Sequence, residues 1–356
     1  MKQTVFFYAF LLTICLITAC SNDNIDGEWL IDRNAIQRGE GKGDIPAINE
    51  PKFLPVKEIE FLSDTSLVIG IKVSDEIKAY PLSILNWHEI VNDEIGDSLI
   101  AITYATLSGS GIAFERRRTN NQLPFKLIVS GLLYNSNLIA NDDLGDNAWL
   151  QFERRAVNGL IIDQGTGEEK LKEFPVVEMN WGAWRLLFPN SQVLTTNTGF
   201  NRPYQTYPYG DYRSDTTELF DLTVPLETLP RPIPYKEKGL GVILGEDAKV
   251  YPMSIFPEEG HRIIHDEFRG VPLVIIGSRE KDLIVAYNRE RADGSISNFS
   301  ISDPTMLIIK DENGQEFNVL GETIDLVSDE DLKPVTSNIA YWFSWPAFFS
   351  NVEIYE

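Results

Sequence analysis

Two stretches of this chain repeat the same residue pattern, and this repeat constrains the fold more than any other feature. Residues 68–85 read VIGIKVSDEIKAYPLSIL, and residues 239–256 read GLGVILGEDAKVYPMSIF. A histidine follows each stretch, His88 in the first copy and His261 in the second. Self-similarity of this kind marks a tandem duplication, with units of about 120 to 150 residues, the usual size of a domain. We therefore expect the two histidines to occupy equivalent places.

Short runs rich in Val, Ile, Leu, Phe and Tyr recur along both copies, with polar or glycine-containing turns between them, which is typical of β-strands. The first copy has strand patterns at residues 67–73, 78–82, 99–104, 111–117, 124–130 and 137–141. Helical patterns are few and short, at residues 82–90 and 180–188. The chain is therefore predicted to be mainly β, a β-rich α+β fold. Its two tandem pseudo-repeats are expected to form β-meander or barrel-like units with a few short helices.

Composition and the repeat together divide the chain into segments. The polar, glycine-containing stretch before the first copy is typical of a flexible tether, and a Tyr- and Pro-rich stretch separates the two copies. The predicted segments are a signal peptide (1–19), the tether (20–45), repeat unit 1 with the candidate site (46–200), the connector (201–235) and repeat unit 2 (236–356).

The chain begins with MKQTVFFYAFLLTICLITAC, whose apolar run is too short for a membrane span but is typical of a signal peptide. The run ends in LITAC, which resembles a bacterial lipobox. That resemblance implies cleavage before Cys20 and a lipid on its thiol. The expected partner is therefore a membrane, and the expected location is the cell envelope. Ser21 at the next position favours the outer membrane. The alternative is an ordinary signal peptide in which Cys20 is incidental.

The two cysteines of the chain, Cys15 and Cys20, both belong to this N-terminal stretch. The folded part of the mature chain would then have no free thiol, which excludes disulfides, thiol catalysis and cysteine metal ligands. The formal net charge of −22 argues against nucleic acid as a partner, because such a surface repels phosphate. No cofactor and no bound metal is predicted.

A cluster of small residues follows one predicted strand of the first copy. Residues 103–116 read TYATLSGSGIAFER, whereas the aligned residues 276–290 of the second copy read IGSREKDLIVAYNRE. Glycine-rich turns let a backbone approach a ligand closely, and they also form ordinary tight turns. The second copy has a charged turn at this place. The duplicated fold therefore does not require the Gly/Ser cluster, and the first copy retains it for another reason.

Seven stretches lie in order over nearly the whole mature chain: GDIPAINEPKF (43–53), KAYPLSILNWHEIVND (78–93), TYATLSGSGIAFER (103–116), LIVSGLLYNSNLIANDD (127–143), NWGAW (180–184), NTGFNRPYQTYPYGDY (197–212) and YWFSWPAFF (341–349). Together they resemble the bacterial domain of unknown function (DUF) 3179 family. The resemblance brings no activity, because the family is named for lacking one. It does imply a Cys-Pro-Leu-Cys-Gly-Thr-like motif at this loop, so that Ala105 and Ser108 stand in place of two thiols.

The Gly/Ser loop is therefore interpreted as the scaffold of a lost metal or thiol site. The candidates to line a cleft around it are His88, Tyr104, Ala105, Ser108, Ser110, Tyr134 and Asn135. His88 has a second interpretation as an ordinary packing residue on a helix.

Two classes of function follow from this interpretation. The sequence favours a non-catalytic, lipid-anchored binding or scaffolding protein with a degenerate metal or thiol site. Enzyme activity is left open and is not favoured. The alternative is a metalloprotein or an enzyme that uses a cleft formed by His88, Tyr104, Ser108 and Tyr134.

Two further patterns have competing interpretations. His261 and His265 are four residues apart, a spacing that can place two zinc ligands on one helix face, although the sequence IIHDEF has strand character. Four tyrosines of the connector resemble a carbohydrate platform, or they pin the connector across the two copies. They are Tyr204, Tyr207, Tyr209 and Tyr212.

Overall fold

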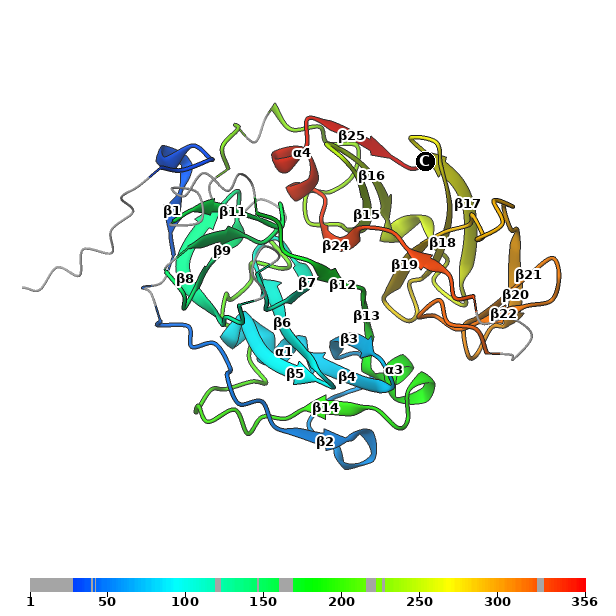
Figure 1. Ribbon diagram of the computed structural model, residues 1–356, viewed down its shortest axis with the longest axis horizontal. Helices are drawn as coiled ribbons and strands as arrows, with labels where there is room; N and C mark the ends of the chain where they lie inside the picture. Colours follow the sequence, from blue (N-terminus) through cyan, green and yellow to red (C-terminus); the bar gives the residue numbers. More distant parts are fainter. Residues whose placement is uncertain are drawn as a thin grey trace, which may run out of the picture.

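The computed structural model describes residues 28–39, 41, 43–118, 123–145, 147–159, 169–215, 222–225, 228–324 and 330–356. The expected signal peptide (1–19) and Cys20 lie outside the described residues. The mainly β prediction is confirmed, because strands form several sheets and the helices are short (Figure 1). The sheets of the described residues do not close into a barrel. In this part of the chain, no helix is long and apolar enough to cross a membrane.

Each copy is built on a central sheet of the same topology. The strands are β2 (Phe53–Pro55), β3 (Leu67–Val73), β4 (Glu76–Pro81), β13 (Val176–Asn180) and β14 (Gln192–Leu194) in the first copy, and β15 (Lys238–Leu244), β16 (Asp247–Pro252), β24 (Ser337–Tyr341) and β25 (Asn351–Ile354) in the second. Their orders are β13-β3-β4-β14-β2 and β24-β15-β16-β25. In both sheets the last strand of the copy, β14 or β25, runs parallel to the second hairpin strand, β4 or β16. The shared topology confirms the tandem repeat.

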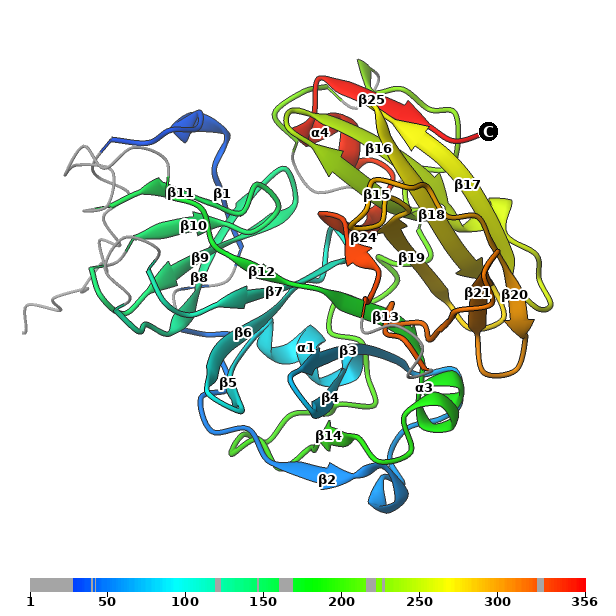
Figure 2. The same cartoon turned by 45° about the vertical axis from the view of Figure 1, so that its right-hand side comes forward.

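A second sheet in each copy also has the same arrangement. Its strands are β5 (Ile90–Ile95), β6 (Ser98–Ala105), β7 (Ser110–Glu115) and β12 (Glu173–Phe174) in the first copy, and β17 (Arg262–Phe268), β18 (Val271–Ser278), β19 (Leu283–Asn288) and β23 (Lys333–Pro334) in the second. The orders are β12-β7-β6-β5 and β17-β18-β19-β23. After the short edge strand, β12 or β23, the chain crosses directly to the central sheet as β13 or β24 (Figure 2).

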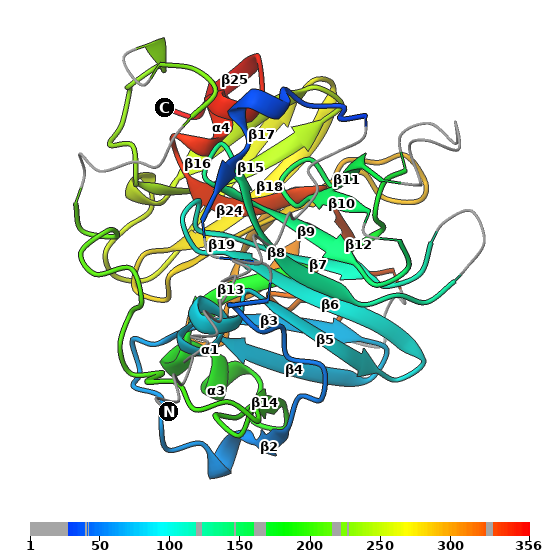
Figure 3. The same ribbon diagram turned by 90° about the vertical axis from the view of Figure 1, so that its left-hand side faces the viewer.

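The copies differ in what they add to this common plan. The first copy adds a five-stranded sheet in the order β1-β8-β9-β10-β11, made of β1 (Gln37–Arg38), β8 (Leu127–Tyr134), β9 (Asn137–Asp142), β10 (Ala148–Leu150) and β11 (Arg155–Asn158). Figure 3 shows this sheet beside β5, β6 and β7. The second copy adds a smaller sheet, β20 (Phe299–Asp303), β21 (Ile308–Asp311) and β22 (Glu316–Phe317).

The helical segments follow the predicted patterns. The helices are α1 (Leu82–His88), α3 (Trp181–Leu187) and α4 (Ser344–Phe348), and the 3₁₀ turns are η1 (Arg33–Ala35), η2 (Val56–Glu58) and η4 (Met253–Ile255). Helices α1 and α3 confirm the helices predicted at 82–90 and 180–188. Pro81 comes directly before α1, where a proline without an N–H costs the helix nothing. In the second copy η4 takes the place of α1 after the equivalent proline.

A glycine in the first strand of each central hairpin, β3–β4 or β15–β16, leaves room for a tryptophan. A Cβ atom on Gly70 of β3 would lie 1.8 Å from the ring of Trp184, and one on Gly241 of β15 would lie 2.1 Å from the ring of Trp345. Both tryptophans are fully buried. The tryptophan rings therefore pack directly on the glycine backbone and fix α3 and α4 against their sheets. We call these two packing positions, Gly70 with Trp184 and Gly241 with Trp345, the glycine seats.

A hydrogen-bond cluster, buried in the first copy and half-buried in the second, also recurs. In the first copy the Asp93 carboxylate accepts a hydrogen bond from the Tyr80 hydroxyl (2.5 Å) and pairs with the Lys78 ammonium (2.9 Å). In the second copy Asp266 accepts from Tyr251 (2.8 Å) and pairs with the equivalent lysine (2.6 Å). The cluster joins the central sheet of each copy to its second sheet, so the tyrosine before the proline of each repeated stretch, and the aspartate that follows in the second sheet, have a structural reason.

Candidate functional site

The Gly/Ser loop ends in two serines that belong to a buried hydrogen-bond network. The hydroxyls of Ser108 and Ser110 lie 3.0 Å apart, and neither residue is exposed. The Asn137 amide donates to Ser108 (2.9 Å), and the Ser110 hydroxyl donates to the Gln151 side-chain oxygen (2.8 Å). The network ties the loop of the second sheet to the added sheet of the first copy. Asn137 and Gln151 were missed from the sequence, although each is a polar residue beside an apolar strand run.

The same loop is also a joint between the two copies. The backbone N–H of Tyr341, the last residue of β24, donates to the carbonyl of Ser108 (2.8 Å), and the Tyr212 hydroxyl donates to the carbonyl of Leu107 (2.8 Å). A Cβ atom on Gly109 would lie 3.1 Å from the Tyr341 ring. The small residues therefore let the second copy approach the loop backbone closely.

The joint is reciprocal. The turn of the second copy, between β18 and β19, accepts a hydrogen bond at the Lys281 carbonyl from the backbone N–H of Asn180 (2.9 Å). Asn180 ends β13 as Tyr341 ends β24, and Lys281 stands in its turn where Ser108 stands in the Gly/Ser loop. In each copy, the last residue of one strand thus donates a backbone hydrogen bond to the turn of the other copy. An ion pair between Lys238 and Glu178 (2.5 Å) adds a further contact across the joint.

His88 is held in a fixed tautomer at the end of α1. Its Nδ1 lies 2.7 Å from the carbonyl of Pro46, and its Nε2 lies 2.7 Å from the hydroxyl of Tyr204. A carbonyl only accepts, so Nδ1 carries the proton, and Nε2 of the neutral ring accepts from the tyrosine. Burial lowers the pKa of His88 and favours this neutral form. The Thr198 hydroxyl lies 2.5 Å from the Tyr204 hydroxyl. It donates to that oxygen, because the single proton of Tyr204 is already used in the hydrogen bond to His88.

The remaining predicted site residues make other contacts. Asn135, with φ of 51°, donates from its amide to the Ala347 carbonyl of α4 (2.8 Å) and accepts from the Thr223 backbone (2.7 Å). The Tyr134 ring lies 6.2 Å from the Phe348 ring. Both residues therefore dock the β8–β9 hairpin on the second copy. The contacts of the predicted residues thus divide into three groups, around His88, around Ser108 with Ser110, and around Asn135 with Tyr134.

Glu89, the residue after His88, has an unusual backbone and an unusual environment. It follows α1 with φ of 54°, a backbone conformation that is strained for a residue with a Cβ atom. Its side chain is buried, and it accepts a hydrogen bond from the Tyr209 hydroxyl (3.4 Å). Burial raises the pKa of its carboxyl to about 7. Its backbone carbonyl accepts from the N–H of Tyr104 (2.7 Å), whose own hydroxyl has a pKa raised well above its usual value by burial.

The connector tyrosines lie against the first copy. Tyr204 bonds His88, Tyr209 bonds Glu89, and Tyr212 bonds the Leu107 carbonyl. Tyr204 and Tyr212 are buried, so their rings do not form an exposed platform. Tyr207 packs under the Arg213 guanidinium, 4.1 Å from its ring centroid. These contacts favour the interpretation that the tyrosines pin the connector.

The two histidines of the second copy lie in different environments. The Nε2 atom of His265 accepts a hydrogen bond from the backbone N–H of Phe299 (2.9 Å). His261 precedes β17, and burial together with Lys281 lowers its pKa. The described residues contain no group of three or more His, Cys, Asp or Glu side chains that could hold a metal ion.

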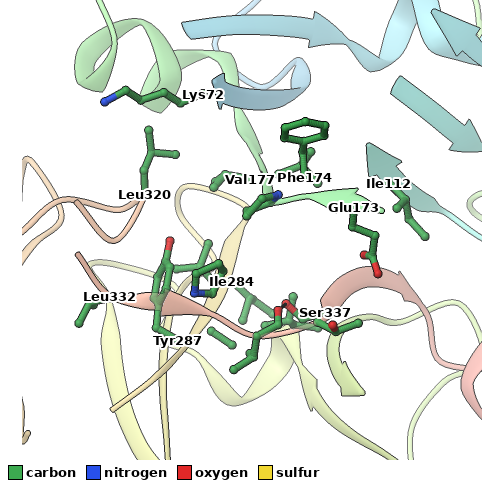
Figure 4. A pocket seen from close by; sticks show the side chains of 18 of the residues that line it. Lys72, Ile112, Glu173, Phe174, Val177, Ile284, Tyr287, Leu320, Leu332 and Ser337 are labelled. Carbon is green, nitrogen blue, oxygen red and sulfur yellow. Dashed lines mark hydrogen bonds between the residues drawn. The ribbon is translucent and has the colours of Figure 1, made fainter. Parts of the chain in front are cut away.

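A groove lies between the two copies, in a place that the sequence did not indicate. Its volume is about 470 Å³, and its walls come from matching segments of both copies. Figure 4 shows Phe174 and Val177 of the first copy facing Ile284, Tyr287 and Leu332 of the second. Most lining side chains are apolar. Polar residues also line it, and among them Lys72 and Glu322 form an ion pair between the copies.

Comparison with known proteins gives a family and no activity. No curated protein and no solved structure matches the chain. A family model described as "Protein of unknown function (DUF3179)" matches residues 42–352, which include both copies, the Gly/Ser loop and the groove. The match agrees with the resemblance noted in the sequence. The chain therefore belongs to the DUF3179 family.

Proposed function

We propose that this protein is a non-catalytic binding protein of the cell envelope, and that it holds its ligand in the groove between its two copies. The observation that carries the proposal is the groove itself. Its volume of about 470 Å³ lies within the usual range for ligand pockets, and it combines apolar side chains with an equal share of polar surface. It also lies between two domain-like units, where ligand pockets are frequent.

The contacts of the Gly/Ser loop support a non-catalytic role. The polar atoms that contact the Ser108 hydroxyl belong to Ala105, Ser110 and Asn137, none of which can act as a general base. The two serines thus use their hydroxyls to hold the loop in place. A degenerate metal or thiol site that has become a joint between the copies accounts for the small residues and for their burial.

A bulky substitution in the groove tests the binding function. Thr336 is exposed and lines the groove, so Thr336→Trp should fill the space without disturbing the core. Nile red, a neutral apolar dye, should bind the wild type with enhanced fluorescence, and Thr336→Trp should lose most of that signal. Lys333→Trp, which adds the same ring outside the groove, is the matched control. Equal dye binding by all three proteins would contradict the proposal.

The lipid anchor is the second part of the proposal, and the LITAC sequence before the folded part supports it. A multiply acylated N-terminus anchors stably, whereas one chain holds weakly. Cys20→Ala should therefore move the protein from the membrane fraction to the soluble fraction, and the wild type should carry a lipid detectable by mass spectrometry. Retention of Cys20→Ala in the membrane fraction would contradict the anchor.

A further inference from the structure

The groove exists because each copy sends its chain from one sheet to another at this place. Strand β23 pairs with only the last two residues of β19, through Tyr287 opposite Pro334 and Asn288 opposite Lys333. The chain then leaves this edge, and the Thr336 carbonyl accepts from the backbone N–H of Ile243 in β15 (2.9 Å). Within the described residues, no strand pairs with the first half of β19 on that side, although β13 of the first copy lies close to it.

The direction of the backbone groups follows from the ladder on the other side of β19. The N–H of Arg289, the residue after β19, donates to the carbonyl of Pro272 in β18 (2.9 Å), next to the last pair of the ladder, Asn288 and Leu273. In an antiparallel ladder, every second residue of a strand directs its N–H and C=O groups to the same neighbouring strand, and the residues between direct theirs to the opposite side. Tyr287 and Val285 therefore bond β18, and Ala286 and Ile284 direct their N–H and C=O groups to the opposite side. Ala286 and Ile284 both line the groove.

The first copy repeats this geometry across the groove. Arg116 donates to the Leu99 carbonyl (2.8 Å) at the end of the β6–β7 ladder. By the same alternation, Gly111 of β7 directs its backbone groups away from β6, and it lines the groove as well. The edges of two sheets, one from each copy, thus border the same groove.

Three carboxylates line the groove, and two of them belong to ion pairs. Glu322 pairs with Lys72, and Glu173 pairs with Arg154 (2.6 Å). Asp331 is exposed and gives this end of the groove a negative charge. A ligand with a positive charge at one end therefore meets Asp331, and its apolar part meets the apolar side chains of the lining.

We infer that the ligand of the groove is a short extended peptide that adds a strand to the open edge of β19 and carries a basic residue beside Asp331. This inference rests on the proposed binding function and gives the ligand its chemistry. Strand addition uses main-chain hydrogen bonds for affinity and pockets for alternate side chains for specificity. The edge of β19 already accepts β23 in this way, so the peptide would continue the pairing that β23 begins.

The test uses the whole protein and an acetylated, amidated tetrapeptide of sequence Lys-Val-Thr-Val. This peptide should displace Nile red and should slow amide hydrogen exchange at Ile284 and Ala286. The same peptide with N-methyl groups on its two central residues cannot pair with a strand edge, and it should bind about tenfold more weakly, in line with the loss of one or two hydrogen bonds. A peptide with Glu in place of Lys should also bind more weakly.

A proline substitution tests the edge from the protein side. Ala286→Pro removes the N–H that points into the groove and leaves the ladder to β18 intact, so peptide affinity should fall about tenfold. Ala286→Val adds similar bulk and keeps the N–H, and it should retain most of the affinity.

Three outcomes separate the inference from the proposed function. Weaker binding by the N-methylated peptide and by Ala286→Pro supports strand addition. Peptide binding that neither change affects, or Nile red binding with no peptide binding, overturns strand addition and leaves the groove as a binding site. If neither the dye nor the peptide binds, both the inference and the proposed function are wrong.

Discussion

The two turns at the joint occupy the same place in their copies and differ in almost every side chain. The turn Ala105–Ser110 is buried and consists of small residues apart from Leu107, whereas the turn Ser278–Leu283 contains a run of charged residues. Both accept a backbone hydrogen bond from the other copy, and both bend at a left-handed residue, Gly109 with φ of 67° and Asp282 with φ of 49°. The backbone path is therefore what the fold needs, and the side chains were free to diverge.

The largest effect is expected where the copies are most alike. Gly70→Ala and Gly241→Ala each place a methyl group inside a tryptophan ring, so each should lower the free energy of unfolding by about 3 kcal/mol or more. The measurement is urea unfolding followed by tryptophan fluorescence. Gly96→Ala, where the added Cβ meets nothing within 4 Å, is the control and should cost about 1 kcal/mol for its positive φ. A mild effect at one of the two seats would break the equivalence of the copies.

A smaller, pH-dependent effect is expected where the copies differ in charge. Glu89 of the first copy corresponds to Arg262 of the second. The pKa of Glu89 is about 7 in the folded chain, above the ordinary value of 4.5, so between these values the folded state binds more protons than the unfolded state. The free energy of unfolding therefore falls as pH rises from about 4.5 to 7.

Glu89→Gln removes this titration. It should make the protein about 2 kcal/mol more stable than the wild type at pH 8, with a smaller difference at pH 5. Urea unfolding at the two pH values measures the change. Arg262→Gln, at the exposed equivalent position, should give the same small difference at both pH values. If Glu89→Gln and the wild type change in parallel with pH, the buried carboxyl is ionised throughout.

The smallest effect is expected at the joint itself. Gly109→Ala adds a Cβ atom 3.1 Å from the Tyr341 ring at a left-handed position, and it should cost about 1 to 2 kcal/mol. Asp282→Gly relieves the same backbone conformation in the second copy and should change stability by less than about 0.5 kcal/mol. The two values come from the same urea titrations. A larger cost for Asp282→Gly than for Gly109→Ala would reverse the comparison.

Much of the fold could be predicted from the sequence because the duplication appears in it directly. Alternating apolar runs place β3, β4, β6 and β7 close to their observed bounds, and the YP pattern marks where each hairpin ends. The register places His88 and His261 at equivalent points, each just before the first strand of its second sheet. The two glycine seats also lie within the repeated stretches, and only the close approach of a tryptophan explains them.

The site was harder to predict because it depends on residues far apart in the chain. The contacts of Ser108 include Asn137 and Tyr341, and those of His88 include Pro46 and Tyr204. The groove is formed by the crossings near Pro175 and Pro334, which have no pattern of their own. Local patterns give the strands, whereas the meeting of two sheet edges depends on how the copies pack.

The reciprocal joint has a consequence for the history of the chain. An interface in which each partner presents the same two elements to the other is isologous, the kind that two identical subunits form around a two-fold axis. A polypeptide of half this length would already have had both surfaces and would have paired with itself. Fusion of two such copies into one chain would make the pair permanent. It would also remove the need for identical halves, so that one turn could consist mostly of small residues while the other gained charged residues.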